Sequence, residues 1–363
     1  MITKDQIIET LRRVEDPQQK KDLVSLNRVL RVDVLGNKII LDIETSSPAM
    51  HVKKKIEQRI TAILHESFGN EIQIALNLVV QAASTRTDSH SILPGVKNII
   101  AVGSGKGGVG KSTVASNLAI ALMKTGAKVG LIDADIYGPS VPVMFDTQYV
   151  RPNVVQKEDG KTYIEPVDNY GIKLLSIGFF SDLNQAVVWR GPMAAKALSQ
   201  MFSDAEWGEL DYLLIDLPPG TGDIPLTLVQ TVPVSGAIIV STPQEVALAD
   251  VRKALSMFNH PNIHVPILGL VENMAWFTPA ELPENKYYIF GKNGVKKLAE
   301  EFHVPLLAQI PLVQSICESG DKGTPAVLQE TNPITPVFIE LAEKVIEQLD
   351  LISIKNTEIS ETN

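Results

Sequence analysis

Apolar and polar residues alternate in two short runs near the start of the chain. The runs 30–34 and 39–43 each carry an apolar residue at every second position, with charged residues between them at 31, 33 and 42. This period of two is typical of strands that bury one face. Gly36 and Asn37 separate the runs and favour a tight turn. The pattern predicts a β-hairpin.

Helical spacing occurs on both sides of this hairpin. Apolar residues recur every three or four positions over 7–14 and again over 52–63, with charged residues on the opposite face of the second stretch. The first helix is expected to end at residues 15–17, Glu-Asp-Pro, because proline disfavours helical conformation in the residue before it. A further alternating run, 72–78, predicts another strand. Together these elements predict a small α+β domain over residues 1–80.

The remaining chain has a different organisation. Residues 81–96 are mostly small and polar and contain Pro-Gly, the composition of a flexible linker. Residues 97–352 alternate β-rich runs with helical stretches, which predicts an α/β domain with a mostly parallel sheet and helices on both faces. Residues 353–363 are rich in Glu, Ser, Thr and Asn, and we expect a disordered tail. The predicted strands of the large domain are 99–103, 129–133, 173–177, 212–216, 237–241, 267–271 and 306–310.

The composition limits the classes of function. The chain has 363 residues, 44% of them hydrophobic and 21% charged, as in ordinary soluble globular proteins of more than one domain. Its net charge of -9 argues against nucleic acid or an anionic membrane surface as partner. Cys317 is the single cysteine, so no intramolecular disulfide can form. No signal segment or membrane-spanning run is recognised, and a cytoplasmic location is expected.

A glycine-rich segment carries the clearest chemistry. Residues 105–112 fit the pattern G-x-x-x-x-G-K-[ST], after an apolar strand and before an amphipathic helix. Glycines let backbone N–H groups surround phosphates, Lys111 places a charge near the β- and γ-phosphates, and the Ser112 hydroxyl ligates Mg²⁺. A chance glycine-rich turn is the alternative interpretation. The expected nucleotide-binding residues are Gly105, Lys106, Gly107, Gly108, Val109, Gly110, Lys111, Ser112 and Thr113.

Three aspartates follow two of the predicted strands. Asp133 and Asp135 come at the end of the run 129–133, and Asp216 ends the run 212–216 in the Walker B form. Because ligands of such sheets bind at the carboxyl ends of the strands, these carboxylates are expected to face the phosphate loop. Asp216 is then expected to contact Mg²⁺ through water. Helix capping is the alternative role for Asp133 and Asp135.

The lysine after the first glycine of the motif, Lys106, makes the loop similar to the deviant Walker A motif of the MinD/ParA superclass. That resemblance implies a homodimer in which Lys106 reaches the partner's phosphates; a solvated loop lysine is the alternative. It also implies that Asp133 helps to hold hydrated Mg²⁺ and that Asp135 orients or activates water, so Lys106, Lys111 and Asp135 are the implied catalytic residues. Asn273 resembles the superclass's adenine-reading asparagine, or else forms a turn.

Four stretches narrow the resemblance: 133–140, 189–193, 216–223 and 271–274. Together they resemble the Mrp/ApbC family of iron–sulfur cluster carriers. The first domain resembles the PaaD-like domain often fused to these ATPases, through residues 15–17 and 46–49. The resemblance implies ATP and Mg²⁺ as cofactors, a transient iron–sulfur cluster, and iron–sulfur apoproteins or assembly proteins as clients.

The number and positions of cysteines in this chain differ from those typical of that family. The family's Cys-x-x-Cys follows the 271–274 stretch, whereas residues 275–283 contain no cysteine, and Met50 stands where related small domains often have a reactive cysteine. A cluster shared by two subunits usually needs about four thiolates. Cys317 offers one per subunit, as a cluster ligand or as an ordinary thiol. The leading hypothesis is an ATPase, expected to be slow, that binds and transfers iron–sulfur clusters or assists their assembly. The alternatives are a nucleotide-gated scaffold or chaperone without a cluster and a MinD/ParA-like positioning ATPase.

Overall fold

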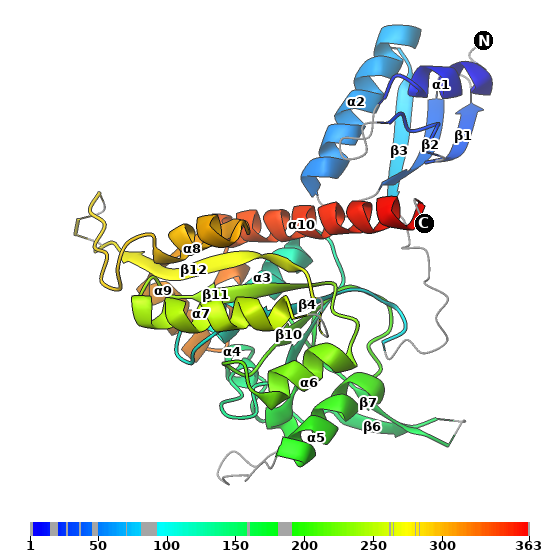
Figure 1. Cartoon of the computed structure of the whole chain (residues 1–363). Helices are drawn as coiled ribbons and strands as arrows, with labels where there is room; N and C mark the ends of the chain where they lie inside the picture. Colours follow the sequence, from blue (N-terminus) through cyan, green and yellow to red (C-terminus); the bar gives the residue numbers. More distant parts are fainter. Residues whose placement is uncertain are drawn as a thin grey trace. The chain divides into compact units, whose positions relative to one another are not determined.

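The computed structural model divides the chain into two compact units, Met1–Thr87 and Asp88–Asn363 (Figure 1). It describes residues 3–14, 21–26, 28–35, 38–45, 50–69, 71–80, 93–157, 160–180, 191–260, 263, 265–279, 281–282 and 284–361. Several features expected from the sequence lie outside these residues: the helix end at 15–17, the turn at Gly36 and Asn37, the motif residues 46–49 and 189–190, and most of the linker (81–92).

The first unit is an α+β fold, as the pattern predicts. Strands β1 (Val29–Leu35) and β2 (Lys38–Thr45) pair antiparallel, and β3 (Gln73–Val80) pairs parallel to β2. Helices α1 (Lys4–Leu11) and α2 (Met50–Phe68) pack against each other and against the sheet. The alternating residues of β2 explain the core, since Ile39, Leu41 and Ile43 are all buried.

The second unit is built on a sheet whose described strands run in the order β13-β12-β11-β4-β10-β5-β9-β8. Neighbouring strands are parallel except for β8, which pairs antiparallel to β9. All the strands expected in this domain are present. Their bounds are β4 (Val96–Gly103), β5 (Val129–Asp133), β8 (Val167–Asn169), β9 (Ile172–Ser176), β10 (Leu210–Asp216), β11 (Gly236–Ser241), β12 (Ile267–Phe277) and β13 (Leu306–Leu312).

Helices cover both faces of this sheet. The connection from β4 to β5 and the connections from β10 through β11 to β12 run in opposite directions along the sheet, so right-handed crossovers place their helices on opposite faces. Helix α3 therefore lies on one face, where it packs against α10, and α6 and α7 lie on the other (Figure 1). The helices are α3 (Lys111–Lys124), α4 (Val141–Met144), α5 (Gly191–Ser203), α6 (Asp223–Thr231), α7 (Glu245–Phe258), α8 (Gly294–Phe302), α9 (Gln314–Asp321) and α10 (Thr335–Glu361), with short 3₁₀ helices η1 (Ile177–Phe180) and η2 (Ala326–Leu328).

Two parts of this unit differ from the expectation. The predicted disordered tail over 353–363 is wrong as far as Glu361, because α10 continues to that residue. The segment contains neither glycine nor proline, and Ile352 and Ile354 remain half-buried, so nothing in the sequence ends the helix earlier. A small antiparallel pair, β6 (Asn153–Gln156) and β7 (Thr162–Glu165), was not expected. No helix among the described residues is long and apolar enough to cross a bilayer.

Candidate functional site

The glycine-rich loop joins the buried end of β4 to the first turn of α3 at the carboxyl edge of the sheet. Gly110 takes the N-cap position of α3 with φ of 81°, a left-handed conformation that favours glycine. Gly105 is required for packing, since an ideal Cβ there would lie 2.3 Å from the backbone carbon of Asp250 in α7. The loop thus brings backbone N–H groups to a helix N-terminus, an arrangement that binds phosphate.

Lys111 lies at the centre of a buried cluster of charges. Its side chain is only 5% exposed, and its Nζ donates to Oδ1 of Asp216 at 2.6 Å and lies 3.6 Å from Oδ2 of Asp135. Nζ also donates to the Ser112 hydroxyl at 3.2 Å. Residues from α3, β10 and the segment after β5 therefore meet at one point, as expected from the shared carboxyl edge of the sheet.

Asp216 has an oxygen available for a further ligand. The side chain is completely buried, and among the described residues its Oδ2 has no hydrogen-bond partner. Burial raises the pKa of this carboxyl, although Lys111 and the Ser112 hydroxyl oppose the rise. A buried carboxylate oxygen without a partner, close to a hydroxyl, is a donor set that suits Mg²⁺. The residues present therefore fit the metal that accompanies nucleotide phosphates.

Asp133 is engaged by the protein itself. Its Oδ1 accepts from the backbone N–H of Asp135, and its Oδ2 accepts from the N–H of Val141 and the hydroxyl of Ser176. Burial, with the neighbouring charge of Asp216, raises the pKa of Asp133 to about 7. This carboxyl holds the segment after β5 in place and so positions Asp135; its part in holding Mg²⁺ stays a prediction.

Asn273 lies against the phosphate loop. Its Nδ2 donates to the carbonyl oxygen of Val109 at 2.9 Å, and an ideal Cβ on Gly110 would lie 2.2 Å from the same nitrogen. The residue is buried near the end of β12, immediately before Met274, which has a φ of 53°. The structure therefore brings Asn273 to the loop, while its contact with adenine stays a prediction.

Lys106 is exposed on the phosphate loop, away from the buried cluster. Its carbonyl oxygen accepts from the Ser104 hydroxyl at 3.0 Å, which stabilises the turn that presents it. The Ser104 carbonyl in turn accepts from the N–H of Gly220 at 2.8 Å, so the loop after β10 is tied to the phosphate loop. Lys106 is therefore placed at the surface, while its action on a second subunit stays a prediction.

Cys317 is separate from this cluster of residues. It lies exposed on α9, with its Sγ 3.8 Å from Oδ2 of Asp321 on the same helix. Within the described part of the chain, no group of three or more His, Cys, Asp or Glu side chains is arranged to hold a metal ion. One subunit thus offers a single accessible thiol and no ligand set around it.

Two buried polar residues near the site, Ser176 and Glu272, were not predicted from the sequence to take part in it. Ser176, at the end of β9, donates to Asp133 and accepts from the N–H of Gly178. Glu272, next to Asn273, accepts from the N–H of Val295 at 2.7 Å and from Gln309 at 2.8 Å, which caps the start of α8. For Glu272, a charged residue within the largely apolar β12 was the available signal, but the sequence alone does not show which neighbours it meets.

Family models match both units. Residues 95–346 match the model described as NUBPL iron-transfer P-loop NTPase, and residues 4–74 match the model described as iron-sulfur cluster assembly protein. A relative named "Iron-sulfur cluster carrier protein" from Synechocystis is 42% identical over 95% of this chain and 98% of its own length. A relative of the same name from Escherichia coli is 42% identical over 94% of this chain and 90% of its own.

Solved structures resemble the second unit. A nucleotide-binding protein from Archaeoglobus fulgidus, in complex with ADP, has a TM-score of 0.56 and 38% identity, covering 66% of this chain and 93% of its own. The cell division ATPase MinD of Pyrococcus furiosus has a TM-score of 0.50 and 24% identity over 69% of this chain and 98% of its own, a likeness of fold alone. The α/β sheet with its phosphate loop is therefore that of a P-loop NTPase.

Proposed function

The chain belongs to the family described as NUBPL iron-transfer P-loop NTPases, and from this premise we propose that it binds ATP with Mg²⁺, hydrolyses it slowly, and carries iron–sulfur clusters to apoproteins or assists their assembly. The observation that carries the nucleotide half is the buried cluster in which Lys111 meets Asp216 and Asp135 beside the phosphate loop. Burying a lysine with two carboxylates costs desolvation free energy. Such clusters of buried charges are therefore typical of sites that bind phosphate and metal.

Each residue of the cluster has a proposed task. The ammonium group of Lys111 binds the β- and γ-phosphates. Ser112, Asp216 and Asp133 hold hydrated Mg²⁺, which would neutralise charge on the phosphate oxygens when bound. Asp135, held in place through Asp133, orients the attacking water. The unpartnered Oδ2 of Asp216 supports this assignment most directly.

We further propose that Asn273 selects adenine. One N–H of its Nδ2 donates to the Val109 carbonyl, which fixes the orientation of the amide, and its Oδ1 can act as an acceptor. An acceptor suits the exocyclic amino group of adenine and disfavours the carbonyl oxygen at the equivalent position of guanine. ATP should therefore bind more tightly than GTP, and Asn273→Ala should reduce that preference in a competition assay that uses a fluorescent nucleotide. Equal preference for both nucleotides in the native protein would contradict this role.

The proposed active form is a homodimer in which Lys106 acts on the partner's nucleotide. The proposal is supported by the exposure of this lysine on a turn that the Ser104 hydroxyl stabilises. Lys106→Ala should keep ATP binding, since the buried cluster is untouched, but should lose turnover and the ATP-dependent increase in mass seen by light scattering. A monomeric Lys106→Ala variant with full turnover would exclude action across the dimer.

Iron–sulfur clusters are the proposed cargo, because the curated relatives are named as carriers of them. Cys317 is the proposed contact on this chain, and it supplies one thiolate from each subunit. The other ligands must then come from a client or from a small thiol. A thiol-bound cargo also favours the reducing cytoplasm as its location. The low cysteine content equally favours a second candidate, a nucleotide-gated scaffold on which clients exchange clusters without a cluster held by this chain.

Two experiments separate these functions. Turnover of Mg-ATP is measured first, in the native protein and in Lys111→Ala, which should lose binding and turnover; unchanged turnover would refute the nucleotide site. Anaerobic reconstitution with iron, sulfide and glutathione then follows, with absorbance and iron counting on the native protein and on Cys317→Ala. A cluster that depends on Cys317 and passes to an apo-ferredoxin supports the carrier. No cluster in either protein, with native ATP turnover, supports the scaffold.

A further inference from the structure

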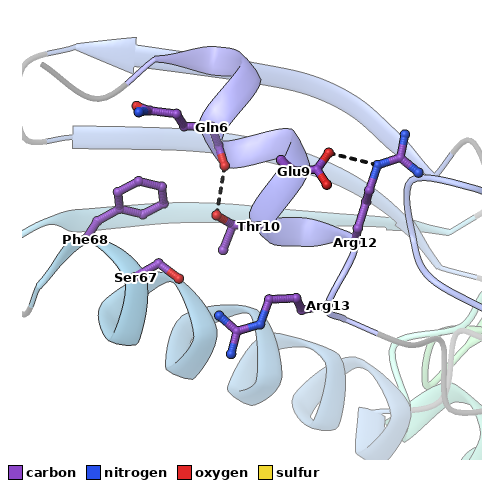
Figure 2. A pocket seen from close by; sticks show the side chains of 7 residues that line it. All are labelled: Gln6, Glu9, Thr10, Arg12, Arg13, Ser67 and Phe68. Carbon is purple, nitrogen blue, oxygen red and sulfur yellow. Dashed lines mark hydrogen bonds and ion pairs between the residues drawn. The ribbon is translucent and has the colours of Figure 1, made fainter.

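The first unit has two adjoining hollows between the end of α1 and the C-terminal half of α2. The larger, of about 440 Å³, is shown in Figure 2, and the smaller, of about 250 Å³, shares Arg13 with it. We call the two together the α1–α2 groove. Its lining residues are Gln6, Glu9, Thr10, Arg12, Arg13, Ser67 and Phe68 in the larger hollow, and Arg13, Arg59, Ala62 and Ile63 in the smaller.

The lining of the groove is cationic on an acidic protein. Arg12, Arg13 and Arg59 supply three positive charges, and Glu9 and the neighbouring Glu66 supply two negative charges, an excess of one positive charge where the whole chain carries -9. Guanidinium groups present planar pairs of donors that match a carboxylate. The charge of the groove is therefore complementary to an acidic ligand.

Two of these arginines already bind carboxylates of the protein's own surface. Arg13 pairs with Glu66 at 3.1 Å with side chains 55% and 64% exposed, and Arg12 pairs with Glu9 at 3.1 Å with side chains 49% and 77% exposed. Ion pairs so exposed contribute about 0–1 kcal/mol. An incoming carboxylate can replace either glutamate at small cost, and the arginines are already held in a geometry that accepts one.

Apolar surface lies beside these charges. Phe68 borders the larger hollow, where Figure 2 shows its ring on the same side as Ser67, and Ala62 and Ile63 line the smaller one. Residues 59, 62, 63 and 66 are spaced so that they share one face of α2. The groove thus combines anion-binding groups with an apolar strip along one helix face, a combination that suits a peptide better than a bare ion.

We propose that the α1–α2 groove binds a short acidic segment of a partner protein. Carboxylates of that segment replace Glu66 at Arg13 and Glu9 at Arg12, and an apolar side chain between them packs against Phe68 or Ile63. The contact area is small, which makes the complex weak and reversible. The groove belongs to the first unit alone, so the proposal does not depend on ATP turnover.

The test uses the full-length protein and a dye-labelled peptide of alternating glutamate and leucine, followed by fluorescence anisotropy at low and moderate salt. Native protein should bind it, and Arg13→Gln should weaken binding by about two- to fivefold, the loss of one exposed ion pair. Glu66→Gln should tighten binding by about two- to fivefold, because it removes the competing carboxylate. Arg31→Gln is the matched control: Arg31 is an exposed arginine of β1 paired with Asp33 at 2.6 Å, and its loss should change nothing.

Three outcomes would overturn the proposal. One is equal binding of a glutamine–leucine peptide, which would remove the role of charge. Another is equally tight, Arg13-dependent binding of inorganic phosphate or of a single-stranded oligonucleotide of the same charge, which would define a general anion site. The third is weaker peptide binding by Glu66→Gln. Circular dichroism and the urea unfolding transition of the first unit verify that each variant is folded, and Arg12→Gln, expected to weaken peptide binding, replaces Arg13→Gln if the latter unfolds.

Discussion

Removal of Lys111 should destabilise the second unit as well as abolish nucleotide binding. In Lys111→Ala, the fully buried Asp216 loses the ammonium group that lies 2.6 Å from it, and Asp135 loses its nearby cation. Breaking a buried ion pair from one side costs about 3–5 kcal/mol, because an uncompensated charge stays in a medium of low polarity. We therefore expect the nucleotide-free variant to unfold at clearly lower urea concentration than the native protein at pH 8.

The size of this loss should depend on pH. Burial raises the pKa of Asp216 above its value in the unfolded chain, and Lys111 is the main group that opposes this rise. A raised carboxyl pKa means that the folded state binds the proton more tightly, so stability falls as pH rises through the folded pKa. Without Lys111 that pKa rises further. The destabilisation of Lys111→Ala should accordingly be smaller at pH 5.5 than at pH 8, because a larger fraction of the Asp216 carboxyl is protonated at the lower pH.

Urea unfolding followed by far-ultraviolet circular dichroism measures this effect, with the transitions of the two units fitted separately. The double variant Lys111→Ala/Asp216→Asn is the control, since it removes the charge that Lys111 compensates. It should recover most of the lost stability while still failing to bind nucleotide. An unfolding midpoint of Lys111→Ala equal to the native one at pH 8, or no recovery in the double variant, would refute the reasoning.

Three further predictions concern the surroundings of the loop. Gly105→Ala places a methyl group against the backbone of α7, so it should lower the stability measured by thermal unfolding by about 1–3 kcal/mol and should also weaken nucleotide binding. Gly138→Ala, whose methyl group meets open space, should change neither stability nor nucleotide affinity. Glu272→Ala leaves the first N–H groups of α8 without a cap and should cost about 1–3 kcal/mol, and Glu272→Gln should lose less; equal losses would contradict a charge-assisted cap. Chelation of Mg²⁺ should abolish most of the ATP-induced rise in melting temperature of the native protein. In Asp216→Asn that rise should already be small, so chelation should change it little.

Periodicity gave the strands and helices of both units because one face of each is buried. The run 212–215 was informative for another reason: it is apolar because it belongs to the central strand β10, which is covered on both sides. The pair β6 and β7 escaped prediction for the opposite reason: all four residues of β6 are exposed, so no buried face marks the pattern. The end of α10 was misjudged because polar composition is compatible with an exposed helix as well as with a tail.

The candidate site was predictable where chemistry depends on spacing along the chain. The loop residues 105–113 and the strand-end carboxylates follow from local patterns, and the shared edge of a parallel sheet brings them together. The Ser176 partner of Asp133 could not be predicted, since it lies 43 residues away in sequence and reaches Asp133 only through packing of β9 beside β5. The bond between Asn273 and the Val109 carbonyl joins positions 164 residues apart and needed the structure in the same way.

Strand β12 places two adjacent side chains on opposite sides: Glu272 faces the start of α8, and Asn273 faces the phosphate loop. Because side chains alternate along a strand, inserting or deleting one residue before Glu272 would exchange the two, burying a carboxylate against the phosphate loop and leaving α8 uncapped. Changes of length in this region are therefore tolerable only beyond Phe277, where β12 ends and exposed residues follow. A designer who grafts a tag or binding peptide into this protein should choose the exposed residues 281, 282, 284 or 285 and leave the strand in register.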